Sequence, residues 1–118
     1  MTTGPLQDQS YRFSLNIVLF CKWMIEEEKE YILSKQLMKA GTSVGANVEE
    51  AQQAQSKPDF ISKLSIALKE AYESRFWLRL ITDSGYAPSD KTEKLKEDVN
   101  QIISMLVRSV KTAKNNLH

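Results

Sequence analysis

The sequence is poor in the residues on which most catalytic and metal sites depend. It contains one cysteine, Cys21, and one histidine, His118, which is its last residue. A lone cysteine excludes a disulfide within the chain and fits a reducing compartment, so we expect a cytoplasmic protein. Its apolar neighbours favour a buried, unreactive thiol. Zinc would lack its ligands, and a serine or cysteine nucleophile would lack a positioned histidine base. We therefore expect no enzyme activity, no cofactor and no metal.

Carboxylates are the remaining groups that could support acid–base or metal chemistry. Glu70 and Glu73 have the i, i+3 spacing of half a di-iron motif, but no histidine lies near them in the sequence. Paired carboxylates alone could act as general acid and base. On a largely apolar helix, ion pairing with Arg75, Arg79 or the cations of a neighbouring chain is the better interpretation. We predict structural ion pairs for four residues, which are Glu50, Glu70, Glu73 and Arg75.

Glycine and proline are scarce as well, with 4 and 3 residues among 118. This scarcity disfavours a many-turned all-β chain. No apolar run approaches the roughly 18 residues that a membrane span requires. Residues 1–9 carry neither the basic nor the apolar region of a secretory signal. We expect no membrane contact and a flexible tail at residues 1–9.

Residues 10–118 are predicted to form a single all-α domain of four helices. Ser10 is a candidate N-cap for the first helix. Ser56 and Asp59 have the spacing of a capping box at the start of the third, and Gly85 supplies a C-terminal stop after it. Each helix is long enough to contribute several turns to one core. The predicted helices cover approximately residues 11–28, 30–55, 56–84 and 88–115.

Two of the four helices carry one apolar stripe with helical spacing, which is typical of a helix with one face in a core and one in water. The second predicted helix has Leu33, Leu37, Ala40, Gly41, Val44, Val48 and Ala51, and the fourth has Leu95, Val99, Ile102, Ile103, Leu106, Val110 and Ala113.

The centre of the second predicted helix is unusually small, with the sequence AGTSVGA at residues 40–46. Two glycines inside a helix cost about 2 kcal/mol relative to alanine. Gly41 and Gly45 are four residues apart and share a face, so close approach of another backbone or a bulky ring would offset this cost. A phosphate-binding loop is the alternative, but it lacks the P-loop lysine and a preceding strand. The residues predicted for close helix packing are Gly41, Ser43, Gly45 and Ala46.

The first and third predicted helices each carry a core stripe and a second set of apolar residues. The core stripes are Phe13, Ile17, Phe20, Cys21 and Met24 in the first helix, and Phe60, Leu64, Ala67, Ala71 and Leu78 in the third. A bundle of this size cannot bury both sides of two helices, so the surplus residues predict an interface between copies in a closed homo-oligomer. Scattered surface hydrophobic residues are the alternative interpretation. The surplus residues are Leu15, Leu19, Trp23, Ile66, Trp77 and Leu80.

The fourth predicted helix ends in basic residues, with no acidic residue after Asp98. Cations at a helix C-terminus complement the helix dipole. Alternatively, Arg108, Lys111 and Lys114 form a nucleic-acid contact that oligomerisation multiplies. The net charge of +1 lacks the basic excess that is usual in nucleic-acid binders.

Two segments resemble one known family. The first is QLMKAGTSVGANVEEA at residues 36–51, and the second is DF at 59–60 followed by IALKEAYESRFWL at 66–78, with Ser74 and Phe76 as conservative departures. They are similar to the signatures of proteins encoded in intervening sequences of bacterial 23S rRNA genes, which are often labelled ribosomal proteins. The resemblance covers approximately residues 13–114 and implies an antiparallel up-and-down four-helix bundle that assembles as a homopentamer. It also implies a relation to the accessory protein of diversity-generating retroelements, which binds nucleic acid.

Together these observations predict a non-enzymatic, oligomeric helical-bundle protein. Its partners would be other copies of itself and RNA or DNA, bound through basic groups repeated around the oligomer. The alternative is a protein–protein scaffold without nucleic-acid contact.

Overall fold

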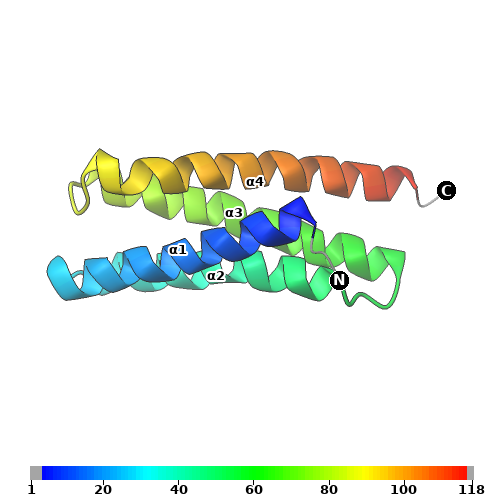
Figure 1. Cartoon of the computed structure of the whole chain (residues 1–118), viewed down its shortest axis with the longest axis horizontal. Helices are drawn as coiled ribbons and strands as arrows, with labels where there is room; N and C mark the ends of the chain where they lie inside the picture. The colour runs from blue at the N-terminus through cyan, green and yellow to red at the C-terminus, as the bar shows by residue number, and fades with distance from the viewer. Residues whose placement is uncertain (1–3, 117–118) are drawn as a thin grey trace.

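The computed structural model describes residues 4–116, which form four α-helices joined by short connections (Figure 1). The chain reverses direction at each connection, so that α4 ends at the side of the molecule where α1 begins (Figure 1). The molecule measures 50 × 24 × 23 Å along its principal axes. No strand occurs among the described residues, as expected for an all-α chain. The helices are α1 (Pro5–Glu27), α2 (Ile32–Ala51), α3 (Lys57–Asp83) and α4 (Ser89–Asn115).

The four helices surround one hydrophobic core. Within the described residues each helix packs against its neighbours in sequence and α1 also packs against α4, whereas the diagonal pairs α1–α3 and α2–α4 bring no Cα atoms within 8 Å of each other. The apolar stripes predicted from the sequence line this core, although Leu33 and Phe60 are only partly buried. The largest fully buried side chains come from all four helices and include Phe13, Met24, Leu37, Leu64, Leu78, Ile102 and Leu106. None of the described helices is long and apolar enough to cross a membrane.

The start of α1 corrects two predictions. The helix begins at Pro5, so residues 5–9 are helical rather than a flexible tail, and residues 1–3 of that tail lie outside the described part of the chain. Proline fits the first helical position, and the Gln7 side chain accepts a hydrogen bond from the backbone N–H of Gly4 at 3.4 Å. Leu6 packs against the core and anchors this first turn. Ser10 is fully buried inside α1 and is not an N-cap.

The connection between α1 and α2 depends on one carboxylate. Glu30 accepts hydrogen bonds from the backbone N–H groups of Ile32, Leu33 and Ser34 at 3.1, 3.0 and 2.8 Å. These are the free donors of a helix N-terminus, so α2 begins at Ile32 and not at the predicted residue 30. Burial raises the pKa of the Glu30 carboxyl, but these hydrogen bonds outweigh it and the net pKa lies below its ordinary value of 4.5. Lys29, just before it, has the left-handed φ of 55° that turns the chain.

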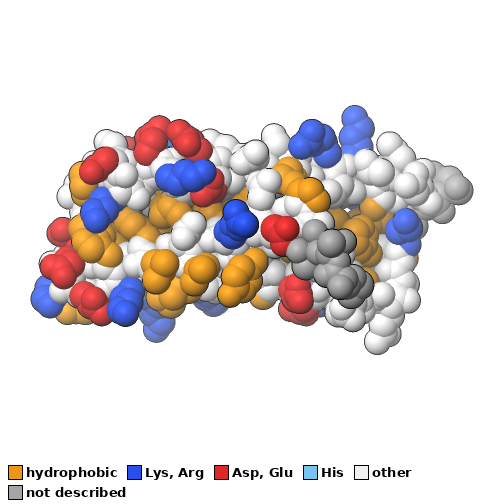
Figure 2. Space-filling view, viewed as in Figure 1, with side chains coloured by type: hydrophobic (Ala, Val, Ile, Leu, Met, Phe, Trp, Pro, Cys, Tyr) orange, Lys and Arg blue, Asp and Glu red, His pale blue; other side chains and the backbone are white. Residues whose placement is uncertain are grey.

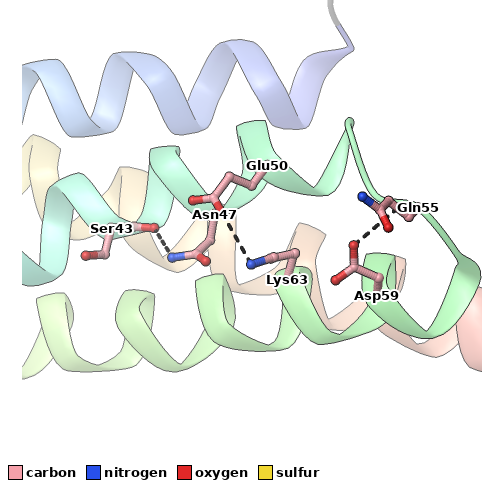
Figure 3. Close-up of polar contacts among 6 residues, drawn as sticks. All are labelled: Ser43, Asn47, Glu50, Gln55, Asp59 and Lys63. Atoms are coloured by element: carbon pink, nitrogen blue, oxygen red, sulfur yellow. Dashed lines mark hydrogen bonds and ion pairs between the residues drawn. The ribbon is translucent and has the colours of Figure 1, made fainter.

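The connection between α2 and α3 confirms the predicted Ser56 N-cap, while the Asp59 carboxylate reaches back to Gln55 and not to Ser56 itself (Figure 3). Ser56 Oγ accepts a hydrogen bond from the backbone N–H of Asp59 at 3.1 Å, and Asp59 Oδ2 accepts one from the backbone N–H of Gln55 at 3.2 Å. Because this extended cap already occupies residues 55 and 56, α2 ends at Ala51 rather than at Gln55. One turn further along, Lys63 Nζ lies 3.3 Å from Glu50 Oε1 and joins α3 to α2.

The predicted glycine stop after α3 is also confirmed. Gly85 has a φ of +85°, which other residues rarely adopt. Its N–H donates to the Thr82 carbonyl at 3.1 Å, and the N–H of Tyr86 donates to the Ile81 carbonyl at 3.2 Å. This pair of bonds is a Schellman motif, which ends α3 without leaving those carbonyls unpaired.

The glycines of α2 allow α1 to approach its backbone closely. A Cβ atom on Gly41 would lie 2.6 Å from Ile17 Cγ2, and one on Gly45 would lie 2.5 Å from Ser14 Oγ. Ser14 Oγ donates to the Gly41 carbonyl at 2.8 Å and accepts from the Gly45 N–H at 3.1 Å. The close approach predicted for the two glycines is therefore present, and a hydroxyl that the sequence did not indicate joins the two helices there.

The other two residues predicted for close packing do not take part in this approach. The Ser43 hydroxyl donates to the Lys39 carbonyl of its own helix at 2.7 Å. Ala46 is exposed. Residues 43 and 46 lie off the line on which Gly41 and Gly45 meet α1, because residues three or four apart share a helix face, and Ala46 borders a groove between α1 and α2.

Cys21 has the buried position expected of an unreactive thiol. Its side chain is fully buried, and Sγ donates to the Ser34 carbonyl at 3.3 Å. Burial, with a smaller contribution from the negative charge of Glu30, raises the pKa of the thiol to about 12. The nucleophilic thiolate is therefore almost absent at neutral pH.

We predict that Gly45→Leu destabilises the bundle by about 3 kcal/mol, because even the first side-chain atom would collide with Ser14. Urea unfolding followed by circular dichroism measures the change. Ala46→Leu is the matched control, since the neighbouring alanine is exposed. Equal unfolding midpoints for Gly45→Leu and the parent would show that the helices can separate at no cost.

We predict that Glu30→Gln lowers the free energy of unfolding by about 1 kcal/mol at pH 7, because it weakens the cap of α2. The folded state lowers the pKa of Glu30, so the contribution of the carboxylate is fully present above pH 4.5 and is lost as the pH falls through the folded pKa. The difference between parent and variant should therefore shrink under acid. Urea unfolding at several pH values checks this, with exposed Glu27→Gln as the control. A pH-independent difference would contradict the role of the charge.

Candidate functional site

An exposed apolar stripe runs along the outer side of α1, where Figure 2 shows hydrophobic side chains gathered. Tyr11, Leu15, Val18 and Leu19 are 68%, 45%, 36% and 54% exposed. Their spacing of three and four residues places them side by side, and exposed Lys22 continues the stripe. We call these five residues the α1 face. Leu15 and Leu19 are exposed as predicted, whereas the sequence analysis did not single out Tyr11 and Val18.

A second exposed apolar stripe lies on α3. Ile66 and Leu80 are 40% and 39% exposed, and exposed Glu73 lies midway between them at intervals of seven residues. Phe76, which is 53% exposed, borders this stripe. We call Ile66, Glu73, Phe76 and Leu80 the α3 face. Because α1 and α3 occupy diagonal positions in the bundle, the two faces lie on different sides of it.

The two tryptophans predicted for the interface pack mainly within their own chain. Trp23 is partly buried against the core and stacks on Phe20 at 5.9 Å between ring centroids, with Lys91 Nζ 4.8 Å from its ring. Trp77 also packs against the core and meets Phe76 edge to face at 5.0 Å. Large rings can close the gaps between neighbouring helices, so an apolar residue off the core stripe need not be free for a partner.

A groove of about 390 Å³ lies beside the α1 face, between α1 and α2. The residues that line it include Tyr11, Ser14, Gly45, Ala46 and Glu49. The small residues that let the helices approach thus also leave this hollow at the surface. The surface beside α1 is therefore hollowed as well as largely apolar, and such a shape can accommodate the side chains of a partner protein.

Two acidic residues of α3, Glu70 and Glu73, lie close to one another. Burial raises the pKa of the Glu70 carboxyl, and the neighbouring charge of Glu73 raises it further, although Lys69 and Lys39 partly oppose this. The predicted pairing with Arg75 is not formed, because Arg75 Nη1 donates to Asn100 Oδ1 at 3.1 Å and its guanidinium lies 5.0 Å from the ring centroid of Tyr72.

Among residues 4–116 the structure contains two direct ion pairs, Glu50–Lys63 and Lys94–Asp98, at 3.3 and 2.9 Å. Glu50 is therefore a structural ion-pair residue as predicted, but its partner Lys63 had not been identified. Glu70 and Glu73 form no such pair within the described chain.

The three cations predicted to form one nucleic-acid contact are exposed and follow one another at intervals of three residues along α4. Arg108 lines a groove with Lys57 and Phe60. Lys111 and Lys114 line another groove. At a helical advance of 100° per residue, positions 108 and 111 lie about 60° apart and positions 108 and 114 about 120° apart, so the three cations spread across the exposed side of α4. Lys57 lines the same groove as Arg108, because the start of α3 lies beside the end of α4.

The described residues offer little for metal or acid–base chemistry. No group of three or more histidine, cysteine, aspartate or glutamate side chains among them could hold a metal ion. A polar groove of about 350 Å³ between α1 and α4 is lined by Arg12, Asn16, Lys94 and Asp98, and in it the Asp98 carboxylate is already paired with Lys94. The exposed faces are thus the most distinctive surface features of the described chain.

Comparisons with known proteins agree with the resemblance found in the sequence. A search of curated proteins gave no match. The chain is similar to a crystal structure of a protein with unknown function from the S23 ribosomal protein family of Bacteroides thetaiotaomicron VPI-5482. The two are 42% identical, the alignment covers 90% of this chain and 98% of the other, and the TM-score is 0.88. A relation to the retroelement accessory protein stays a prediction. Residues 6–108 match the family model of the 23S rRNA-intervening sequence protein, and the chain belongs to this family.

Proposed function

We propose that this chain is a non-enzymatic cytoplasmic protein that assembles into a closed homo-oligomer and serves as a protein–protein scaffold. Each subunit is an antiparallel up-and-down four-helix bundle. The α1 face and the α3 face supply the contacts between subunits. The family resemblance described above supports five subunits.

The observation that carries this proposal is the exposure of two separate apolar stripes. Twelve large apolar side chains among the described residues are exposed to water, and seven of them belong to the two faces. Burying apolar surface contributes roughly 25 cal/mol per Å², so covering both stripes stabilises an assembly substantially. Contiguous exposed apolar surface on a small protein usually marks an interface.

We predict that light scattering at micromolar concentration gives the mass of an oligomer. A closed assembly keeps the same mass as the concentration rises, whereas an open chain of subunits grows. Five subunits correspond to five times the 13.5 kDa of one chain. A mass of one chain at every micromolar concentration would contradict the proposal.

Nucleic-acid binding is a second candidate function. It is favoured by the run of α4 after Asp98, which carries exposed Arg108, Lys111 and Lys114 and no acidic residue. Lys57 adds a fourth cation at the same end of the bundle. An oligomer would repeat these four cations in every subunit, so that contacts that are weak in one subunit together give strong binding. Such binding would be tolerant of sequence and sensitive to salt, because it depends on phosphate contacts.

We predict that changing Arg108, Lys111 and Lys114 to glutamine together abolishes binding of structured RNA or DNA in a filter assay at low salt, while the oligomer stays intact. The matched control changes Lys91, Lys94 and Lys96, three cations interspersed with acidic residues earlier in α4. Unchanged binding by the first variant would remove these cations from the contact. If the parent binds neither nucleic acid at low salt, this second function is wrong and the scaffold stands.

A further inference from the structure

We propose that the groove between the start of α3 and the end of α4 binds an unpaired nucleotide of single-stranded RNA or DNA. The base would stack on Phe60, and the phosphates would contact Lys57 and Arg108. This inference rests on the proposed nucleic-acid binding and names the form of nucleic acid that is bound. We call this groove the stacking groove. It shares no residue with the α1 face or the α3 face.

The stacking groove lies where α4 continues beyond the start of α1. Figure 1 shows that the last turns of α4 extend past the first turn of α1, and no described residue of α1 lines the groove. Phe60 belongs to the apolar stripe of α3 but is only partly buried, whereas Leu64, one turn further along, is fully buried. The missing cover by α1 accounts for this difference and leaves the ring of Phe60 at the surface.

Phe60 and Lys57 also line a second groove, at the end of α2 and its connection to α3. The stacking groove has a volume of about 340 Å³ and the second groove one of about 300 Å³. Each lies at the lower end of the range of roughly 300–1,000 Å³ that is usual for ligand pockets. A strand of nucleotides can therefore occupy one groove and continue into the other past the two shared side chains, whereas a free mononucleotide would not need the second groove.

The charge of the two grooves suits phosphate. Lys57 and Arg108 are exposed, and neither forms a direct ion pair within the described chain. None of the described residues that line the two grooves is acidic. Asp59, the acidic residue nearest to Lys57 in the sequence, already accepts a hydrogen bond from the backbone N–H of Gln55. The two cations are therefore available to the phosphates of a ligand.

The aromatic ring selects an unpaired nucleotide among the possible anionic ligands. Every base has a flat face that can stack on an aromatic ring, so this contact does not depend on sequence. In a duplex each base is already stacked between its neighbours, and only an unpaired base can reach the ring. A partner that is merely acidic would use the two cations and leave the ring unused.

The remaining lining groups are also those that a nucleotide uses. Ser109, Thr112 and Asn116 bring two hydroxyls and one amide to the stacking groove, and these groups both donate and accept hydrogen bonds. The groove of Lys111 and Lys114 is lined by aliphatic residues and one asparagine, without an aromatic ring. It therefore offers phosphate contacts alone and provides a matched control.

Fluorescence polarisation at low salt tests the inference. The probes are labelled oligouridylate and oligothymidylate, which are unpaired, and a duplex of oligothymidylate with oligodeoxyadenylate of the same length. We expect the parent to bind at least one of the single strands more tightly than the duplex. Phe60→Leu should weaken binding of that single strand about tenfold and leave duplex binding unchanged. Phe60→Tyr keeps an aromatic ring and should retain the affinity of the parent. Phe76→Leu, which removes an exposed ring outside the groove, should also bind as the parent does.

A pair of charge variants gives a second test that does not alter the partly buried ring. Lys57→Gln with Arg108→Gln should reduce the preference for single strands over the duplex. Lys111→Gln with Lys114→Gln removes the same charge from the groove without a ring and should leave that preference unchanged. All four side chains are exposed, so both variants should keep the fold, which circular dichroism checks. This comparison decides the matter if Phe60→Leu does not fold.

The outcomes separate this inference from the function on which it rests. If the parent binds the duplex or polyglutamate as tightly as the single strands, or if folded Phe60→Leu binds as the parent does, the stacking groove is wrong although binding through the α4 cations stands. Displacement of the probe by uridine monophosphate at a similar concentration would overturn a strand as the ligand. A parent that binds none of the nucleic acids at low salt would overturn the stacking groove and nucleic-acid binding together.

Discussion

The close approach of α1 to the backbone of α2 is the constraint on which the arrangement of the other surfaces depends. Gly41 and Gly45 remove the side-chain atoms that would hold the helices apart, and the Ser14 hydroxyl of α1 bonds to the Gly41 carbonyl and the Gly45 N–H of α2. With α1 held this close, Ile17 enters the core directly over Gly41. The side of α1 opposite Ile17 is then turned outward, and its large apolar side chains are 36–68% exposed in the subunit.

Much of the fold could be predicted from the sequence because the relevant signals are local. The core stripes follow from helical spacing, and the start and end of α3 follow from Ser56, Asp59 and Gly85, whose hydrogen bonds lie within a few residues. The start of α1 was missed because its signal, Pro5, lies outside the apolar stripe that defined the helix. The start of α2 was missed because Glu30 is not a common capping residue, and its role depends on where Lys29 turns the chain.

The surface was predicted less completely, since it depends on which neighbouring helix each side chain meets. Leu15 and Ile66 were assigned correctly to exposed positions, whereas Trp23 and Trp77 close gaps within the subunit. Helical spacing alone does not distinguish these cases, because it gives the direction of a side chain but not the distance to the next helix. The same limitation applies to the cations of α4, which lie near one another in sequence but line two different grooves.

The reactivity of Cys21 toward an alkylating reagent reports how often α1 and α2 separate. The thiol is fully buried where α1 meets the first turn of α2, and it is the sole cysteine of the chain. An alkylating reagent reaches it only when α1 separates from α2 or the whole subunit unfolds, and only then does its pKa return toward the ordinary value. The rate of its modification in native buffer therefore measures how often this helix pair opens, without any label being introduced.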